Sequence, residues 1–597
     1  STVTLNGEIE SSNDAIVLGA VTLGSATTID TDASDTTGDI TIGAVTGGSN
    51  SLTLSTGDNV ANTDITASGA ISGVTTLTLA DVGGTATLSG DVDVTTLTVG
   101  STVANVAITG SGSSVTNAVS FANDGTLQLG DATGDSLTFN GGIDTTSVGS
   151  TVTLNGTIAS SNDAIVLGAV TLGSATTIDT NASSNAGDIT VAAITGGSNN
   201  LTLSTGDNVS GADITASGAI SGLGNLTLAD VGGTATFSAN VAAAALSADS
   251  TVANISFTGG SNTFSAASTL ANDGTLTFGD ATGDSFTFNG GLTTSSVGST
   301  VTLNTSISSS DDALTFGAIT LGNNVTLDTN STTTNRADIA IGAVTGGSNT
   351  LTLTTENNVT GADITASGAI SGVTTLTLAS VGGTATLSAD VDVTTLSVDN
   401  TVANVAFTGN GSSVTNSFTP ANDGTFVFGT SGGTQTYNGG LTTTSVGSTV
   451  TLNGSIVTSN DALTFGAVTL GSATTIDTNA SSTTGDLTLG VVTGGSNTLT
   501  LSTGDNVANS DITASGNISG VTTLTLADVG GTATLSGDVD VSTLSVDNTV
   551  ANVAFTGNGS TVTNSFTPTN DGTLTLGATG VGSGTTQTFN GGLNTNS

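Results

Sequence analysis

Residues 64–99 decide the fold, and they read DITASGAISGVTTLTLADVGGTATLSGDVDVTTLTV. Apolar and polar residues alternate in short runs such as Leu77-Thr78-Leu79, and this period of two predicts strands that bury one face. Thr fills most alternate positions, and its β-branched side chain suits an exposed strand face. Clusters of Gly, Asn, Asp and Ser separate the runs, as in tight turns. The stretch therefore predicts an all-β fold.

The pattern recurs because the chain consists of four tandem 149-residue repeats. The string STVTLN begins at Ser1, Ser150, Ser299 and Ser448. The strings TGGSN and DITASG recur in the same register, with shifts of a residue or two. The predicted repeat modules are module 1 (1–149), module 2 (150–298), module 3 (299–447) and module 4 (448–597). Neither end shows an atypical capping repeat, so we expect the chain to be a cut from a longer array.

A weaker period divides each module into smaller units. Leu5, Ile42 and Leu79 follow one another at intervals of 37 residues, with a further strand between them. We expect rungs of roughly 18–25 residues, about seven per module, each adding about 4.8 Å for a rise of about 34 Å per module. The predicted fold is a parallel β-helix (β-solenoid) rod with a core of Leu, Ile and Val ladders. A string of β-sandwich domains is the alternative, since sandwiches also have short strands and frequent turns. Very short strands, the absence of Trp and the absence of a linker between modules favour the solenoid.

Charge and composition exclude several classes of partner. The chain has 46 acidic residues and one basic residue, Arg336, for a formal net charge of −45. Nucleic acids and anionic lipids are bound mainly through Lys and Arg, so we expect neither as a partner. No stretch of about 20 apolar residues occurs, so we expect no membrane insertion. Without Cys or His, thiolate and imidazole metal sites are excluded.

One group of acids forms a candidate calcium site. Asp124, Asp131 and Asp135 lie in turn-rich sequence, and calcium prefers hard oxygen ligands. Module 2 repeats the set as Asp273, Asp280 and Asp284, whereas module 3 retains only Asp423. The spacing is not that of an EF-hand, and ordinary Asx turns are the alternative interpretation. No cofactor is required by any motif, and calcium is carried as a candidate.

A pair of acids and a set of Thr residues also invite a functional interpretation. Asp91 and Asp93 share one strand face, and glycosidases use paired carboxylates about 5–9.5 Å apart. Module 2 has Asn240 and Ala242 there, so surface acids are the favoured interpretation. Thr76-x-Thr78 and Thr53-x-Ser55 would form outward rows of hydroxyls if rungs superpose. Some β-solenoids bind ice with such rows, but the β propensity of Thr explains them equally.

Four aromatic residues share one module position, and one cation stands alone. The aromatic residues are Phe139, Phe288, Tyr437 and Phe589. We interpret them as core residues rather than as a binding stripe. Arg336 has no basic counterpart in the other modules and is interpreted as incidental.

Strings such as GGSNSLTLSTGDNV (47–60) and TATLSGDVDVTTLTV (85–99) resemble the repetitive β-helical stalks of large bacterial exoproteins, especially filamentous-haemagglutinin-like adhesins. The resemblance implies a right-handed parallel β-helix at a bacterial surface, active in adhesion, aggregation or matrix building, and it offers no catalytic residues to transfer. We expect an extracellular, secreted or cell-surface structural fibre or stalk that is not an enzyme. Its expected partners are like modules, including self-association, with glycans or cell surfaces as further candidates. An adhesin shaft that itself binds glycans or neighbouring cells is the alternative.

Overall fold

The computed structural model describes residues 3–34, 38–57, 60–184, 187–331, 337–356, 359–481, 485–578 and 584–596. Its strands pair in parallel from rung to rung, with about 21 residues per turn, so the fold is an all-β parallel β-solenoid. This confirms the predicted fold class. The alternative of β-sandwich domains is wrong, because sandwiches are built from antiparallel sheets. The chain divides into two compact units, Ser1–Thr302 and Leu303–Ser597, which are described separately.

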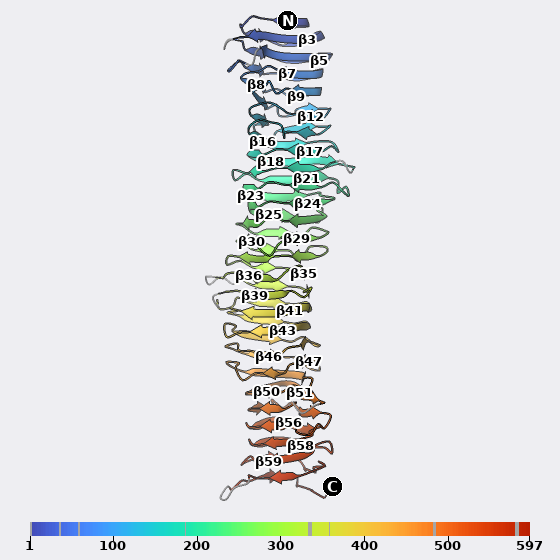
Figure 1. The fold of residues 1–597 in the computed structure, drawn as a ribbon, viewed down its shortest axis with the longest axis vertical. Helices are drawn as coiled ribbons and strands as arrows, with labels where there is room; N and C mark the ends of the chain where they lie inside the picture. The colour runs from blue at the N-terminus through green and yellow to red at the C-terminus, as the bar shows by residue number, and fades with distance from the viewer. Residues whose placement is uncertain are drawn as a thin grey trace. The chain divides into compact units, whose positions relative to one another are not determined.

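Each turn in the first unit crosses three faces. Long strands bend over two of the faces and stack on one another at the blue end of Figure 1: β1 (Val3–Glu10), β3 (Val21–Ala33), β5 (Val45–Gly57), β7 (Ile71–Ala80) and β9 (Val92–Val99). Short strands pair on the third face: β2 (Ile16–Leu18), β4 (Ile40–Ile42), β6 (Ile65–Ala67), β8 (Thr85–Leu88), β10 (Asn105–Ile108) and β13 (Leu127–Leu129). Three ladders of parallel strands therefore enclose the core.

The second unit has the same construction. One ladder contains β38 (Val344–Thr345), the first part of β41 (Ile370–Ala379), β43 (Val391–Val398), β45 (Ser413–Val414) and β47 (Thr434–Tyr437). Another contains β37 (Ile339–Ile341), β40 (Ile364–Ala366), β42 (Thr384–Leu387), β44 (Asn404–Phe407), β46 (Phe426–Phe428) and β49 (Val450–Val457).

Alternate residues of every ladder fill the core. Ile29, Leu54 and Leu79 lie on successive rungs and are fully buried, whereas the Thr residues between core positions face outward and are partly exposed. Burying a Leu or Ile side chain contributes about 1.5–3 kcal/mol, so the stacked aliphatic residues supply the main stabilising term. The predicted Leu, Ile and Val ladders are confirmed.

Aromatic side chains extend these ladders. Phe257 stacks on Phe237 and on Phe278, with ring centroids 4.8 and 6.0 Å apart. The predicted core aromatics Phe139, Phe288 and Tyr437 are all buried. Their copy Phe589 is half-buried and stacks on Phe566 at 5.6 Å. The interpretation as core residues is therefore confirmed for three of the four positions and partly for the last.

Acidic and amide side chains join rungs at one corner of each turn. Asp39 Oδ1 accepts a hydrogen bond from the backbone N–H of Asp64 at 2.9 Å, and Asp64 Oδ1 accepts from Thr85 N–H at 2.7 Å. Two rungs later, Asn105 Oδ1 accepts from Thr126 N–H at 2.9 Å. Equivalent Asp-to-backbone bonds recur in modules 2, 3 and 4. These side chains satisfy strand-entry N–H groups that would otherwise lack an acceptor.

The module is not a whole number of turns. One ladder of the first unit runs through Thr4, Thr22, Thr46, Ser72, Asp93, Ser114, Thr138 and Ala159. Thr153, the module 2 copy of Thr4, pairs instead with Gln128, on the ladder that starts at Val17. A module therefore makes six complete turns and crosses two of the three faces of the next, close to the seven rungs expected.

Module copies consequently lie on different faces. Ser221, the module 2 copy of Ser72, lies on the ladder of Thr66. In the second unit, Ser519 likewise lies on the ladder of Thr365 and not on that of its module 3 copy, Ser371. Each module is thus rotated by one face relative to the module before it in the same unit.

The fractional number of turns in each module predicts which deletions the fold tolerates. A chain lacking residues 150–298 joins Gly149 to Ser299, which recreates the sequence junction that Gly149 and Ser150 make. We expect it to keep a β-rich far-ultraviolet circular dichroism spectrum and a cooperative thermal transition near that of the full chain. A chain lacking residues 150–309 also loses the two strands that open module 3, and it should melt at a lower temperature. Equal melting temperatures of the two deletion variants would contradict the proposed number of turns per module.

Candidate functional site

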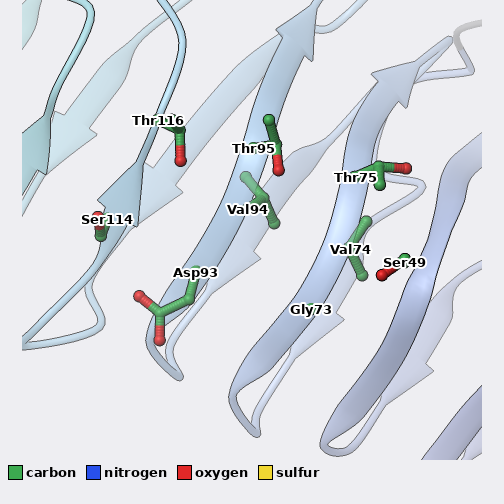
Figure 2. Close-up of a pocket in the computed structure, with 9 residues that line it drawn as sticks. All are labelled: Ser49, Gly73, Val74, Thr75, Asp93, Val94, Thr95, Ser114 and Thr116. Carbon is green, nitrogen blue, oxygen red and sulfur yellow. The ribbon is translucent and has the colours of Figure 1, made fainter.

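A hollow in the surface of module 1 is the best-formed candidate site. It has a volume of about 300 Å³ and lies across β5, β7, β9 and the rung that follows (Figure 2). Its lining consists of Ser49, Gly73, Val74, Thr75, Asp93, Val94, Thr95, Ser114 and Thr116. Figure 2 shows Thr75, Thr95 and Thr116 on successive rungs, and the carboxylate of Asp93 nearer the start of β9, on the side of the rung that carries Ser114. The hollow therefore combines one acid with several hydroxyls.

Two glycines shape this hollow. Gly73 is an extra residue in β7, because Ser72 pairs with Asp93 and Val74 pairs with Val94, and its φ of 66° favours glycine. Gly47 approaches this bulge so closely that a Cβ there would lie 2.4 Å from the carbonyl oxygen of Gly73. The resulting step in the sheet leaves room above the strands that follow.

The side chains that line the hollow and reach solvent are mainly polar. Val74 and Val94 are almost fully buried and belong to the core. Asp93, Thr95 and Thr116 are exposed around them. A ligand in this hollow would meet a carboxylate acceptor, hydroxyls that donate and accept, and a small aliphatic surface.

The same hollow recurs once in each of the other modules. In module 3 it contains Thr374, Asp392 and Thr394, and in module 4 it contains Thr522, Asp540 and Ser542. In module 2 the corresponding residues are Gly224, Ala242 and Ala244, and the volume is about 380 Å³. Module 2 thus keeps the hollow but lacks the carboxylate and two hydroxyls.

The carboxyl of Asp392 is partly desolvated in its hollow. Burial raises the pKa of Asp392, the nearby Asp390 carboxylate raises it further, and a hydrogen bond with the backbone of Ser413 opposes both effects. A carboxylate in this environment gains more from a hydrogen-bond donor than a fully hydrated one does.

The predicted calcium residues do not gather into a metal centre. Asp124 is exposed, while Asp135 is buried and its Oδ2 accepts hydrogen bonds from the N–H groups of Asp131 and Ala132 at 2.7 and 2.9 Å. Asp284 caps its turn in module 2 in the same way. In the described ranges, no three acidic side chains are grouped so that they could hold a metal ion. This geometry favours the Asx-turn interpretation, and calcium binding stays a prediction.

The other sequence candidates lie as follows. Asp91 Oδ1 accepts a hydrogen bond from Gly112 N–H at 2.9 Å, so of the pair only Asp93 enters the hollow. A row of Thr hydroxyls does form on one face, through Thr28, Thr53, Thr78 and Thr98. Ser55 alternates with the buried Leu54 and Thr56 and pairs with Asp30, but it is itself buried, so it adds no exposed hydroxyl to such a row. Arg336 lies outside the described residues.

Sequence reasoning identified Asp93 but missed Ser49, Thr75, Thr95 and Thr116. These residues come from four rungs and meet only through the register of the ladders. The recurring TGGSN string and the glycine in Ser72-Gly73-Val74 were the available signals. Both mark a bulge, but neither identifies the residues beside it.

Comparison of the chain with protein-family models, curated proteins and solved structures yields no match. Within the part of the chain that the structure describes, no helix is long and apolar enough to span a bilayer.

The turn of module 1 provides a test of the calcium prediction. Replacing Asp135 with Ala removes the acceptor of two backbone N–H groups and should cost about 1–2 kcal/mol of stability. Because this role is structural, we expect the loss measured by chemical denaturation to be the same in calcium and in a chelator. Asp131→Ala removes an exposed carboxylate and is the matched control, with little expected effect. A loss seen only with calcium present would instead identify Asp135 as a metal ligand.

A pair of carboxyls in module 3 makes stability depend on pH. Burial raises the pKa of Asp328 to about 6, and the neighbouring Glu356 carboxyl raises it too, against a hydrogen bond from Asn330 N–H. Because this pKa lies above its unfolded value of 3.8, the folded chain binds the proton more tightly, and stability falls as pH rises from about 4 to 6.

Glu356 stands where the other modules have Gly57, Gly206 and Gly504, and its φ is 51°. Glu356→Gly should therefore raise the melting temperature at pH 7 and reduce the fall between pH 4 and 6. Glu356→Gln removes the charge but keeps the backbone strain, so it should reduce the fall with pH to a similar extent and raise the melting temperature at pH 7 by less than Glu356→Gly does. Unchanged pH dependence of melting in both variants would contradict the proposed coupling.

Proposed function

We propose that this chain is an extracellular structural spacer, a stalk or fibre whose length is set by the number of modules, and that it is not an enzyme. The observation that carries the proposal is the unbroken succession of parallel rungs within each unit, with one aliphatic core behind three ladders. Such a body resists bending, because each rung is hydrogen-bonded along its length to the rungs on both sides. Repeat architectures of this kind extend by adding copies.

The surface chemistry supports a role outside the cell. Only 8% of residues are charged, the outward strand positions are mainly Thr, and no cysteine is present to depend on a redox environment. The resemblance to stalks of filamentous-haemagglutinin-like adhesins supports a bacterial surface as the location. The proposed partners are like modules in a longer array. A net charge of −45 would keep neighbouring copies apart at low salt and permit lateral contact once it is screened.

Electron microscopy of purified chains tests the spacer proposal. A module of six full turns and two faces should add about 32 Å at about 4.8 Å per rung. We expect the full chain to appear as a thin rod, and the chain lacking residues 150–298 to be shorter by that amount. Displayed on a cell surface, arrays of increasing copy number should carry a terminal tag outward in equal steps. Beads joined by flexible links, or a reach that does not grow with copy number, would contradict the proposal.

A further inference from the structure

We propose that the hollows of modules 1, 3 and 4 each bind a neutral sugar residue of a glycan. The term "acidic hollows" is used below for these three sites, which contain Asp93, Asp392 and Asp540. This inference goes beyond the spacer function, which requires no ligand.

The dimensions of the acidic hollows suit a single ring of a longer chain. Their volumes of about 300, 280 and 300 Å³ lie at the small end of ligand sites, which start near 300 Å³. The hollows are depressions in a sheet surface rather than enclosed cavities, so a chain is able to continue on both sides of the bound ring.

The polar groups match the hydroxyls of a neutral sugar. Asp93 accepts hydrogen bonds only, and sugar hydroxyls that donate to a carboxylate form charge-assisted bonds. The hydroxyls of Thr75, Thr95 and Thr116 are able to donate to ring oxygens and to accept from sugar hydroxyls. In modules 3 and 4 the copies of Thr75, Thr374 and Thr522, donate to the carbonyls of Asn349 and Asn497 at 3.1 Å and keep their acceptor capacity. The methyl groups of the Thr side chains offer a small aliphatic surface to the C–H face of a ring.

Charge argues against other ligand classes. With 46 acidic residues and one basic residue, the chain repels phosphate, sulfate and uronic acid groups. A metal ion needs more than the single carboxylate that each acidic hollow provides, and the described residues contain no group of three acids positioned for one. A neutral donor-rich ligand is what remains compatible with the lining.

Module 2 provides an internal comparison. Its hollow has Ala242 in place of the carboxylate, with Gly224 and Ala244 in place of two hydroxyls. The backbone there is preserved, since Gly222 has a φ of 63° against 66° for Gly73. The structure therefore tolerates these residues, and module 2 should not bind.

The rotation between modules sets the directions in which the sites face. Asp392 lies on the ladder of Ser371, whereas Asp540 pairs with Ser519, on the ladder of Thr365. The acidic hollows of modules 3 and 4 thus open on different faces of the same unit. A straight glycan along one face meets only one of them, so the two sites would bind separate glycan chains and cross-link them.

Isothermal titration of the full chain with neutral hexasaccharides of glucose, mannose, xylose and galactose tests the proposal, with a hexagalacturonate as the anionic probe. At least one neutral hexasaccharide should bind at three sites per chain, and the hexagalacturonate should not. The triple variant D93A/D392A/D540A introduces the residue of module 2 at each site. It should weaken binding at least about tenfold, the effect of losing a charged hydrogen-bond partner.

The matched control is D91N/D390N/D538N, which also removes three carboxylates and also introduces the module 2 residue. Asn240 Oδ1 accepts the same bond from Ser261 N–H at 2.9 Å as Asp91 Oδ1 accepts from Gly112 N–H, so this variant should keep the fold. It should change affinity by less than about twofold. Conversely, G224T/A242D/A244T should raise the number of sites from three to four.

The proposal is overturned if no neutral hexasaccharide binds, if the hexagalacturonate binds better, or if the test and control triple variants lose affinity equally. A site number that stays at three in the gain-of-function variant would also overturn the assignment to these side chains. Thermal melting of every variant verifies that affinity changes do not come from unfolding.

Discussion

The parallel backbone ladder is the constraint on which the rest of this structure depends. Each rung must present its N–H and C=O groups to the rungs on both sides, so every change in chain length between rungs has to be absorbed in turns and bulges. The step from Thr4 to Thr22 is 18 residues and the step from Thr46 to Ser72 is 26. Part of the longer step lies in the Gly47–Ser49 bulge, where the register shifts. The hollow beside it is thus a consequence of keeping the ladder intact.

The ladder also explains how a module can comprise a fractional number of turns. A copy rotated by one face remains stable only if the faces are interchangeable as core surfaces. Val152 pairs with Leu127 and Val170, and all three are buried, because all three ladders alternate buried aliphatic residues with outward Thr or Ser. The equivalence of the faces lies in the core, whereas the outward residues remain free to differ. Surface features are therefore distributed around the axis of a unit while the interior stays uniform.

The fold could be predicted from the sequence because its signals are local. In Leu77-Thr78-Leu79 the alternation of apolar and polar residues predicts which side chains are buried, and the 149-residue repeat is evident in the sequence. Ser55 is buried although it alternates with the buried Leu54 and Thr56, so alternation alone did not predict its exposure. The candidate site could not be predicted from the sequence, for a different reason. Its residues lie about one turn apart in the chain, and they meet only because the register places Ser114 opposite Asp93 on the next rung.

The acidity of the chain follows in part from the same ladder. At the corners, strand-entry N–H groups are satisfied by the Oδ1 atom of a residue one rung earlier, as Asp39 and Asp64 show. Asp and Asn offer a short side-chain acceptor with this reach, as Ser306 does for Thr326 N–H, whereas Lys and Arg donate but do not accept. A solenoid that uses Asp side chains as acceptors at these corners gains carboxylates as rungs are added. The same bonds require no Lys or Arg. The imbalance of 46 acids to one base therefore has part of its origin at these corners, whereas Asp93 lies in the hollow and is not one of these corner acceptors.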